Sequence, residues 1–368
     1  MTLKIQKSVA GECVVFTLSG RIEMEHLAEL QRLFEIETQD LAVVLDMKEV
    51  KLVDRDALSS LARWELDGVK LENCPAYIRE WIVQERAGRN RSQRGNQSMT
   101  DAIHRIESFQ GSEGKISVRV WQNPAARHLV VIAHGYGEHI GRYEHVAQRL
   151  VATGSSVWGP DHLGHGRSDG ERALVRDFEH VVDDLDHVVA MARESHHELP
   201  VVLIGHSMGG MIAARYAQCH GGALAGLILS SPALGRLEAV EQLLALPQIA
   251  DVPIDPAVLS RDSAVGEAYA SDPLVYHGPF KRQTLESMRT TLVAIDTGPG
   301  FGELPTLWLH GSDDKLVPIE SARTGLAKLR GAVFTERSYE SARHELFNET
   351  NQAEVLGEVS NFIDRVTR

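Results

Sequence analysis

The sequence predicts an α/β protein in which a small α/β domain precedes a doubly wound, mostly parallel sheet with a helical cap. Three observations support this fold class. Apolar strand-like runs alternate with helical patterns from residue 101 to residue 368, as in a sheet with helices on both faces. A glycine-rich turn, Gly205–Gly210, separates one apolar run from a helical pattern. The composition changes between residues 87 and 100, which divides the chain into two segments.

The composition and charge exclude several classes of protein. The chain has 368 residues, of which 43% are hydrophobic, and its formal net charge is −13. This negative charge does not favour a nucleic-acid partner, since a phosphate backbone needs a positive surface. The sequence contains no uncharged apolar run of about 18 residues, and residues 1–5 do not form a secretory apolar block. We therefore expect a cytoplasmic protein that does not span a membrane.

The first segment, residues 1–86, alternates short strands and helices. The strand patterns cover residues 3–9, 14–18 and 41–45, and the helical patterns cover residues 25–34 and 54–66. Residues 87–100 follow as a predicted flexible linker, because they offer no apolar area to bury. Met99 and Thr100, at the end of this linker, resemble a second start of the chain.

The order of elements in the first segment resembles the STAS domain of anti-sigma factor antagonists. The matching residues are Leu45–Val50 followed by Val53–Ala57. In that family a Ser at the helix start accepts a phosphate that switches partner binding. The matching position here is Arg55 or Asp56, and neither has a hydroxyl, so we expect no phosphate switch. A small structural or protein-interaction module with an unidentified partner is the alternative.

The second segment, residues 101–368, repeats strand and helix. Residues 103–109 and 115–122 are predicted to form a leading hairpin. Parallel strands are predicted at residues 128–133, 156–158, 201–204, 224–229, 306–309 and 333–337. Helices are predicted at residues 144–151, 176–193, 211–218, 320–329 and 353–365. Residues 236–300 are too many for a simple crossover and are predicted to form the cap. Functional groups in such folds gather at the carboxyl ends of the strands.

The turn Gly205–Gly210 has the Gly-x-Ser-x-Gly pattern of a nucleophile elbow, with Ser207 at its centre. Such a turn strains the Ser backbone and brings neighbouring strand and helix so close that only Gly fits beside it. A glycine-rich turn without chemistry is the alternative for this motif alone. The motifs at the other strand ends favour the interpretation of Ser207 as a nucleophile.

Three further strand ends carry groups that would complete a serine hydrolase. His134–His139 is a glycine-containing loop, from which the Tyr136 amide could join the Met208 amide in an oxyanion hole. A later strand is followed by the carboxylates Asp313 and Asp314, and the last strand is followed by His344. The order Ser, acid, His is the order that α/β-hydrolases use.

A metal site is not indicated. Of the 17 histidines, His162 and His165 are three apart, but no His-Glu-x-x-His helix is present. The three cysteines, Cys13, Cys74 and Cys219, are odd in number and far apart. This favours neither a disulfide framework nor a zinc knuckle.

The second segment resembles the monoacylglycerol lipases of the α/β-hydrolase superfamily. The matching stretches are His134–Tyr143, Asp161–Ser168, Gly205–Gly210, Val258–Asp262, Ala268–Leu274 and Leu309–Asp314. The resemblance implies Ser207 as nucleophile, Asp314 as the acid and His344 as the base, with no cofactor. It also implies a pocket for the glycerol head group.

That head-group pocket maps to Arg142, Tyr269 and Glu238. An ion pair with a neighbouring acid is the alternative for Arg142, and packing within the cap is the alternative for Tyr269. The start of the cap carries an apolar face that could touch a lipid surface or pack onto the body: Leu237, Val240, Leu243, Leu244, Leu246 and Ile249.

The expected reaction is a two-step acyl transfer that cleaves a monoacylglycerol into fatty acid and glycerol. A general carboxylesterase or a lysophospholipase would use the same residues. Dehalogenases and most epoxide hydrolases of this fold need Asp where Ser207 stands. A different class remains open: a signalling protein whose first segment is the working part.

Overall fold

A computed structural model describes most of the second segment and part of the first. The described residues are 3–10, 13–22, 42–53, 61, 64–65, 69–75, 78–79, 104–196, 198–249 and 253–368. The chain divides into two compact units, residues 1–100 and 101–368. The predicted helix at 25–34, most of that at 54–66, Arg55, Asp56 and the predicted linker at 87–100 lie outside the described residues.

The N-terminal unit contains a four-stranded sheet in the order β1-β2-β3-β4. The strands are β1 (Lys4–Ala10), β2 (Cys13–Ile22), β3 (Ala42–Val53) and β4 (Lys70–Glu72). β1 is antiparallel to β2, while β3 is parallel to both β2 and β4. Alternate side chains of β2 and β3 enter the core of this unit, among them Phe16, Leu18, Leu45 and Met47. This period of two is what strands with one buried face require.

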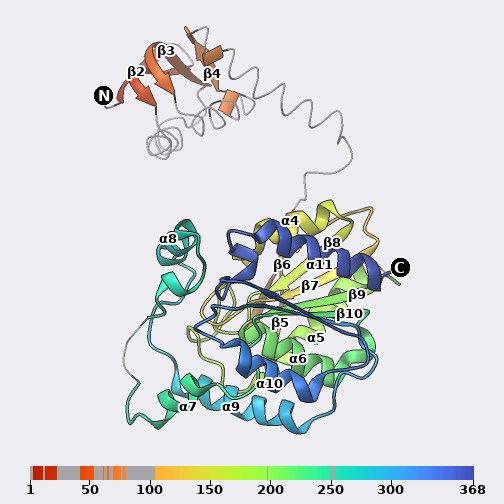
Figure 1. The fold of residues 1–368 in the computed structure, drawn as a ribbon. Helices are drawn as coiled ribbons and strands as arrows, with labels where there is room; N and C mark the ends of the chain where they lie inside the picture. The colour runs from red at the N-terminus through yellow and green to blue at the C-terminus, as the bar shows by residue number, and fades with distance from the viewer. Residues whose placement is uncertain are drawn as a thin grey trace. The chain divides into compact units, whose positions relative to one another are not determined.

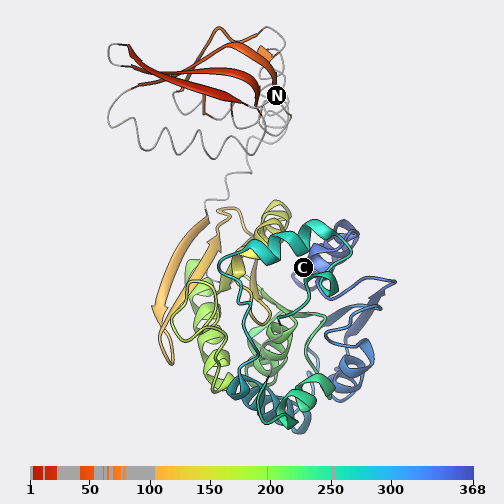
Figure 2. The same cartoon turned by 90° about the vertical axis from the view of Figure 1, so that its left-hand side faces the viewer.

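The C-terminal unit is built on an eight-stranded sheet in the order β12-β11-β10-β9-β7-β8-β6-β5. The strands are β5 (His104–Gln110), β6 (Lys115–Trp121), β7 (His128–Ala133), β8 (Ser155–Pro160), β9 (Val201–His206), β10 (Gly226–Ser230), β11 (Thr306–Gly311) and β12 (Phe334–Tyr339). The predicted hairpin is β5–β6, and the predicted parallel strands are β7 to β12. These sequence predictions are confirmed. In Figure 2 the hairpin lies at one edge of the sheet.

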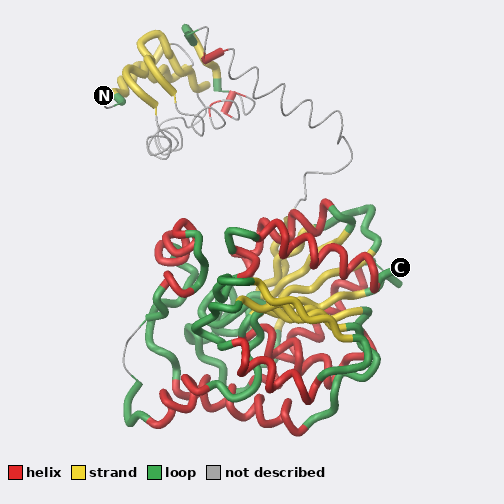
Figure 3. The backbone as a smooth tube through the Cα atoms, viewed as in Figure 1, coloured by secondary structure: helices red, strands yellow, loops and turns green. Residues whose placement is uncertain are grey.

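Helices cover both faces of this sheet (Figure 1). On one face lie α5 (Phe178–Ser195), α6 (Met208–His220) and α10 (Ile319–Leu329), and on the other lie α4 (Glu144–Ala152) and α11 (Gln352–Val366). Figure 3 shows the strands as a central layer between these helices. The side chains of β7 show that both faces of the sheet are apolar and must be buried by helices. Leu129 and Val131 belong to the core under α5 and α6, whereas Val130 and Ile132 belong to the core under α4 and α11.

The predicted cap contains α7 (Glu238–Ala245), η3 (Pro256–Val258), α8 (Ser263–Ser271) and α9 (Arg282–Thr297). α9 packs against α5, α6, α7 and α10, and α8 packs against η3. Short 3₁₀ turns elsewhere are η1 (Ile140–Tyr143), η2 (Gly221–Ala223) and η4 (Leu346–Asn348). Within the described ranges, no helix has the length and apolar character needed to cross a bilayer.

The apolar face predicted at the start of the cap packs onto the body. Val240 is buried in the large core, and Leu237, Leu243, Leu244 and Ile249 pack against that core. Leu246 differs, because 43% of its surface is exposed. The sequence left two alternatives for this face, packing onto the body or contact with a lipid surface. Packing accounts for every residue except Leu246.

Candidate active site

Ser207 occupies a strained turn between β9 and α6. Its φ is 55° and its ψ is −120°, a region that side chains other than Gly rarely adopt. A Cβ on Gly205 would lie 2.3 Å from the Gly209 carbonyl oxygen, and one on Gly209 would lie 2.1 Å from the Ala133 carbonyl oxygen. Neither position admits another residue. The predicted reason for the glycines of this motif, a close approach of strand and helix, is confirmed.

The structure brings Ser207, His344 and Asp314 into one hydrogen-bonded chain. The Ser207 hydroxyl donates to His344 Nε2 at 2.9 Å, and His344 Nδ1–H donates to Asp314 Oδ2 at 2.7 Å. The neighbouring Asp313 is half-buried and pairs with Lys315 at 2.5 Å. Of the two carboxylates in this loop, only that of Asp314 contacts the imidazole.

Asp314 is held as a buried carboxylate. Its Oδ1 accepts the amide hydrogens of Leu316 and Val317, both at 2.9 Å. Its Oδ2 also lies 3.4 Å from the Nε2 of His310. Burial by itself would raise the pKa of Asp314, but the charge of His344 and the hydrogen bonds from His310 and His344 outweigh it and hold the pKa well below its usual range. Asp314 therefore stays ionised while it orients the imidazole.

The imidazole of His344 is buried beside three carboxylates. Burial lowers its pKa, but the charge of Asp314 and its hydrogen bond, together with the charges of Glu345 and Glu138, raise the pKa above its ordinary value overall. The ring of His206 lies beside this ring, with centroids 4.8 Å apart and the two planes tilted by 53°. Burial and the neighbouring His344 charge lower the pKa of His206 to about 4, so His206 is neutral beside a basic His344.

The two residues whose amides are predicted to form an oxyanion hole, Tyr136 and Met208, line the same cavity as Ser207. Met208 is the first residue of α6, where amides have no acceptor within the helix. Within the described parts of the chain, the Tyr136 amide has no protein acceptor. Glu138 Oε1 accepts the preceding Gly135 amide at 2.6 Å, which fixes the loop. Both amides are therefore available to a negative oxygen near Ser207, at the positive end of α6.

One end of the adjoining cavity is polar. Arg142 donates two hydrogen bonds to Glu345, at 2.7 and 2.8 Å, and one to Glu138 at 2.6 Å. Its guanidinium also lies 5.1 Å from the ring centroid of Tyr269. Arg142 and Tyr269 both line the cavity, so Arg142 is both an ion-pair partner and a cavity residue. Two carboxylates around one guanidinium leave this end with a net charge of −1.

Glu238 does not reach the cavity, contrary to the sequence prediction. It is exposed at the start of α7 and is absent from the cavity lining, although its neighbours Leu237 and Ala239 are present. The apolar side of this helix turns Leu237, Val240 and Leu243 toward the cavity. Successive helical residues point about 100° apart, so the same rotation turns Glu238 to solvent.

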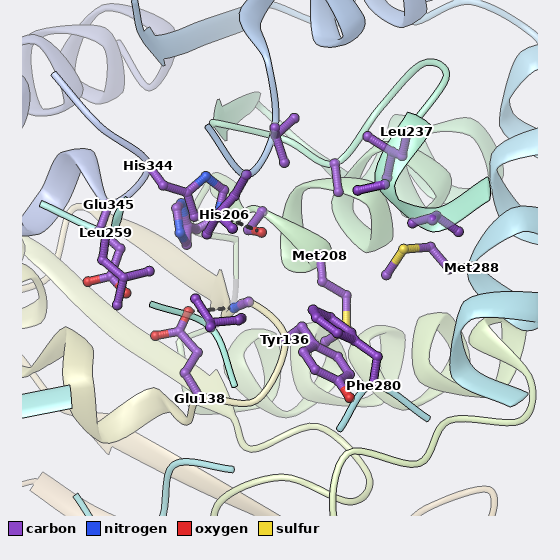
Figure 4. Close-up of a pocket in the computed structure, with 18 of the residues that line it drawn as sticks. Tyr136, Glu138, His206, Met208, Leu237, Leu259, Phe280, Met288, His344 and Glu345 are labelled. Carbon is purple, nitrogen blue, oxygen red and sulfur yellow. Dashed lines mark hydrogen bonds between the residues drawn. The ribbon is translucent and has the colours of Figure 1, made fainter. Parts of the chain in front are cut away.

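The other end of the cavity is apolar. The whole cavity holds about 200 Å³, and Leu237, Val240, Phe280, Leu285 and Met288 line this end. Figure 4 shows Glu138 and Glu345 on one side of the cavity and Leu237 and Met288 on the opposite side, with Met208 between them. The cavity therefore suits a molecule with one polar and one apolar end.

The cap is hydrogen-bonded to the backbone of two loops of this site. The Glu345 amide donates to the Leu259 carbonyl at 2.8 Å, which ties the loop of His344 to η3. The Tyr276 amide donates to the Gly137 carbonyl at 2.7 Å, which ties the loop of Tyr136 to the segment after α8. The positions of the imidazole and of the Tyr136 amide thus depend on the cap.

Sequence reasoning missed Glu138, Glu345 and His310. Glu138 lies inside the loop that sequence analysis selected, and Glu345 directly follows His344. A rule that treats acids adjoining a catalytic motif as candidates would have found both. His310 lies inside the selected stretch Leu309–Asp314, but its role comes from a 2.8 Å hydrogen bond to the Val317 carbonyl that only the folded loop creates. Among the residues that the structure describes, no cluster of His, Cys, Asp or Glu is arranged to hold a metal ion.

Comparison with known proteins identifies the family. Residues 124–351 match the profile of the family described as serine aminopeptidase, S33. The chain belongs to this family of α/β-hydrolases. A monoacylglycerol lipase from Mycolicibacterium smegmatis is 34% identical over 276 residues, which are 72% of this chain and 99% of the relative. The human monoglyceride lipase is 35% identical over 246 residues, which are 64% of this chain and 79% of the relative.

A solved structure agrees with this assignment. The monoacylglycerol lipase of Paleococcus ferrophilus is 26% identical, with a TM-score of 0.59. The match covers 71% of this chain and 99% of that protein. The α/β-hydrolase fold expected from the motifs is confirmed. The chain is accordingly a serine ester hydrolase.

Proposed function

We propose that this serine hydrolase cleaves monoacylglycerols into a fatty acid and glycerol. The observation that carries the proposal is the cavity beside Ser207, whose polar and apolar ends flank the nucleophile. A monoacylglycerol has the same arrangement, with a diol on one side of its ester and an alkyl chain on the other. The lipase relatives support the same substrate class.

In the first step we assign Ser207 as the nucleophile and His344 as the base. The Ser207 oxygen attacks the ester carbonyl while its proton moves to His344 Nε2, along the 2.9 Å hydrogen bond. Asp314 keeps the proton of His344 on Nδ1 and stabilises the imidazolium. The negative oxygen accepts the amides of Tyr136 and Met208, each worth about 3 kcal/mol of barrier. The Nε2 proton then passes to the leaving glycerol oxygen as the C–O bond breaks.

In the second step water replaces glycerol. His344 Nε2 takes a proton from water as its oxygen attacks the acyl carbonyl, and the same amides stabilise the second negative oxygen. Collapse breaks the bond to Ser207, which recovers its proton from His344 as the fatty acid is released. The proton that Ser207 loses leaves with glycerol, and a proton from water replaces it, so the cycle balances without a cofactor.

The polar end favours a neutral head group. Glu138, Glu345 and Arg142 carry a net charge of −1 together, so the phosphate of a lysophospholipid would be repelled there. The hydroxyl of Tyr269 has no protein partner among the described residues and faces a cavity also lined by these carboxylates. Donors and acceptors of this kind suit the two free hydroxyls of a glycerol ester.

The test is a series of esters assayed on the full chain. We expect monoacylglycerols to be cleaved with a higher kcat/KM than lysophospholipids or short-chain carboxylesters, and Ser207→Ala to abolish every activity. Labelling by a fluorophosphonate probe should be lost in the same variant. A preference for lysophospholipids would identify a lysophospholipase, and equal rates on all esters would identify a general carboxylesterase.

For the N-terminal unit we propose a STAS-like interaction module. Its mixed sheet, with β3 between β2 and β4, supports this assignment. A separate signalling role is testable by an affinity purification that compares the full chain with a chain starting at Met99. For the cap we propose contact with lipid surfaces through the exposed Leu246. Binding to phosphatidylcholine vesicles should weaken in Leu246→Ser.

A further inference from the structure

A second cavity lies beside the catalytic one, between α7, α9 and α10. It holds about 330 Å³. Figure 1 shows these three helices side by side at one end of the C-terminal unit, and α9 packs against the other two. We call this cavity the α7–α9 groove. Leu237 and Val240 line both it and the catalytic cavity, so these two side chains form a shared wall.

The floor of the groove continues the apolar wall of the catalytic cavity. α9 contributes Leu285 and Met288 to the catalytic cavity, and then Leu292, Val293 and Ile295 to the groove. Of these groove side chains, Val293 is the most accessible, with 58% of its surface exposed. Apolar area continues along one helix from the nucleophile to the protein surface, a path that suits an alkyl chain.

The rim of the groove carries more cations than anions. Arg236 is exposed, and its guanidinium has no acid partner within the described ranges. Arg289 lies 3.9 Å from Glu241, a long separation for an ion pair, while Lys328 is 2.6 Å from Asp296. Three cations and two carboxylates give the rim a net charge of +1, although the whole chain carries −13. An anionic group is therefore favoured at this rim.

We propose that the α7–α9 groove binds a long-chain carboxylate, with its head group at Arg236 and Arg289 and its tail on the apolar floor. The identity of the occupant rests on the proposed function, because a fatty carboxylate is what ester cleavage by this enzyme releases. A neutral acyl ester fits the floor but, among the described residues, leaves Arg236 without an acid partner and the net charge of the rim uncompensated. In a fatty carboxylate, the carboxylate matches the cationic rim and the alkyl chain matches the apolar floor.

Occupation of the groove has a consequence for catalysis. A tail on the groove side of Leu237 and Val240 restricts the movement of these side chains into the groove, and long acyl chains need that room in the catalytic cavity. The bound product therefore slows cleavage of long-chain esters and leaves short-chain esters unaffected. Simple competition at Ser207 would slow both equally.

The binding experiment separates the groove from the catalytic cavity. Ser207 of the full chain is labelled to completion with a long-chain alkyl fluorophosphonate, which fills the catalytic cavity, and oleate is titrated below its micelle concentration. We expect one equivalent of oleate to bind, and oleyl alcohol to bind at least about tenfold more weakly because it lacks the charge. Absence of oleate binding to the labelled protein, or equal binding of the alcohol, would overturn the proposal.

Variants test the site within the groove. Arg236→Gln combined with Arg289→Gln should weaken oleate binding about tenfold or more, and Val293→Asp should do the same by placing a like charge on the floor. Arg149→Gln, which removes a charge from an exposed arginine on α4, is the matched control and should change nothing. Unchanged binding in both groove variants would assign the oleate to another surface.

Hydrolysis of the ester series is measured on the same preparations before labelling. If no ester is cleaved but oleate still binds at the rim, the proposed function fails and the groove remains. If esters are cleaved but the labelled protein binds no oleate, the groove proposal fails and the proposed function remains.

Discussion

The loops at the carboxyl edge of the large sheet and the cap above them line one cavity by different means. The edge loops hold Ser207, Asp314 and His344 through short hydrogen bonds, and the backbone at Ser207 is strained. The cap contributes mainly apolar side chains from α7 and α9, such as Leu237 and Met288. The edge is therefore organised by directional contacts and the cap by packing.

This difference separates chemistry from selection. A directional contact fails when one atom is removed, whereas apolar packing adjusts to small changes in shape. Substitutions in the edge loops should lower kcat by orders of magnitude. Substitutions in the cap should instead change which esters are cleaved, by smaller factors.

The largest effect is expected for Ser207→Ala. Loss of the nucleophile should reduce kcat for every ester by about 10⁴-fold or more, as in other serine hydrolases. Thermal unfolding should show no large loss of stability. The substitution removes one oxygen atom and its hydrogen bond to His344, and it leaves the surrounding packing unchanged. An active Ser207→Ala enzyme would show that the chemistry lies elsewhere.

Asp314→Asn should follow with a loss of about 10⁴-fold in kcat, because the amide favours the wrong tautomer of His344. Asp313→Asn is the matched control and should stay within about twofold, since the Asp313 carboxylate pairs with the exposed Lys315 and not with the imidazole. The reverse result would transfer the role of the acid to Asp313.

The pH dependence sharpens the same prediction. His344 acts as a base only when it is neutral, and the carboxylates around it raise its pKa. Activity should therefore fall as the pH decreases through a value above the ordinary pKa of His, which is about 6.5. Removing the charge in Asp314→Asn lowers the pKa of His344, so the acid limb of kcat/KM in the remaining activity should move to lower pH. A limb that does not move would contradict this coupling.

Arg142→Met tests the polar end of the cavity. It leaves Glu138 and Glu345 buried without their cation, which should cost roughly 3–5 kcal/mol of unfolding free energy. The acid limb should move to higher pH, because two uncompensated carboxylates favour the charged form of His344. Arg142→Lys keeps the positive charge, so its pH profile should be close to that of the unmodified enzyme. Its free energy of unfolding should recover less, because Lys cannot make the paired hydrogen bonds of Arg142 to Glu345. Denaturant unfolding and pH–rate profiles measure the two effects.

Met288→Trp tests the apolar end and should have a smaller effect. The larger side chain shortens the cavity, so kcat/KM for long-chain monoacylglycerols should fall about tenfold while short-chain esters stay within about twofold. Thr290→Trp, on the exposed side of the same helix, is the control and should leave the chain-length profile unchanged. Equal losses for all chain lengths would contradict the assigned position of the acyl chain.

The smallest effect is expected for a chain that starts at Met99. The C-terminal unit has its own core and contains every residue of the site. Its kcat/KM should remain within about twofold of the full chain. Loss of activity in a folded protein would show that the N-terminal unit contributes to the site.

The same contrast explains which features the sequence could predict. Strand ends are visible as changes in hydrophobic pattern, and parallel strands bring their ends to one edge, so Ser207, Asp314 and His344 could be placed together from the sequence. The cap offers no such constraint. Glu238 was selected from the family resemblance, and the sequence of the cap does not show how α7 is rotated against the body, so its exposed position could not be predicted.

Two backbone hydrogen bonds join the cap to the site loops, from the Glu345 amide to the Leu259 carbonyl and from the Tyr276 amide to the Gly137 carbonyl, and they limit how this enzyme can be re-engineered. A chimera that takes its lid from a relative would inherit a new selectivity together with new anchor points. Unless residues 256–262 and 272–277 of this chain are kept at the junctions, such a hybrid should lose turnover before it gains a new substrate.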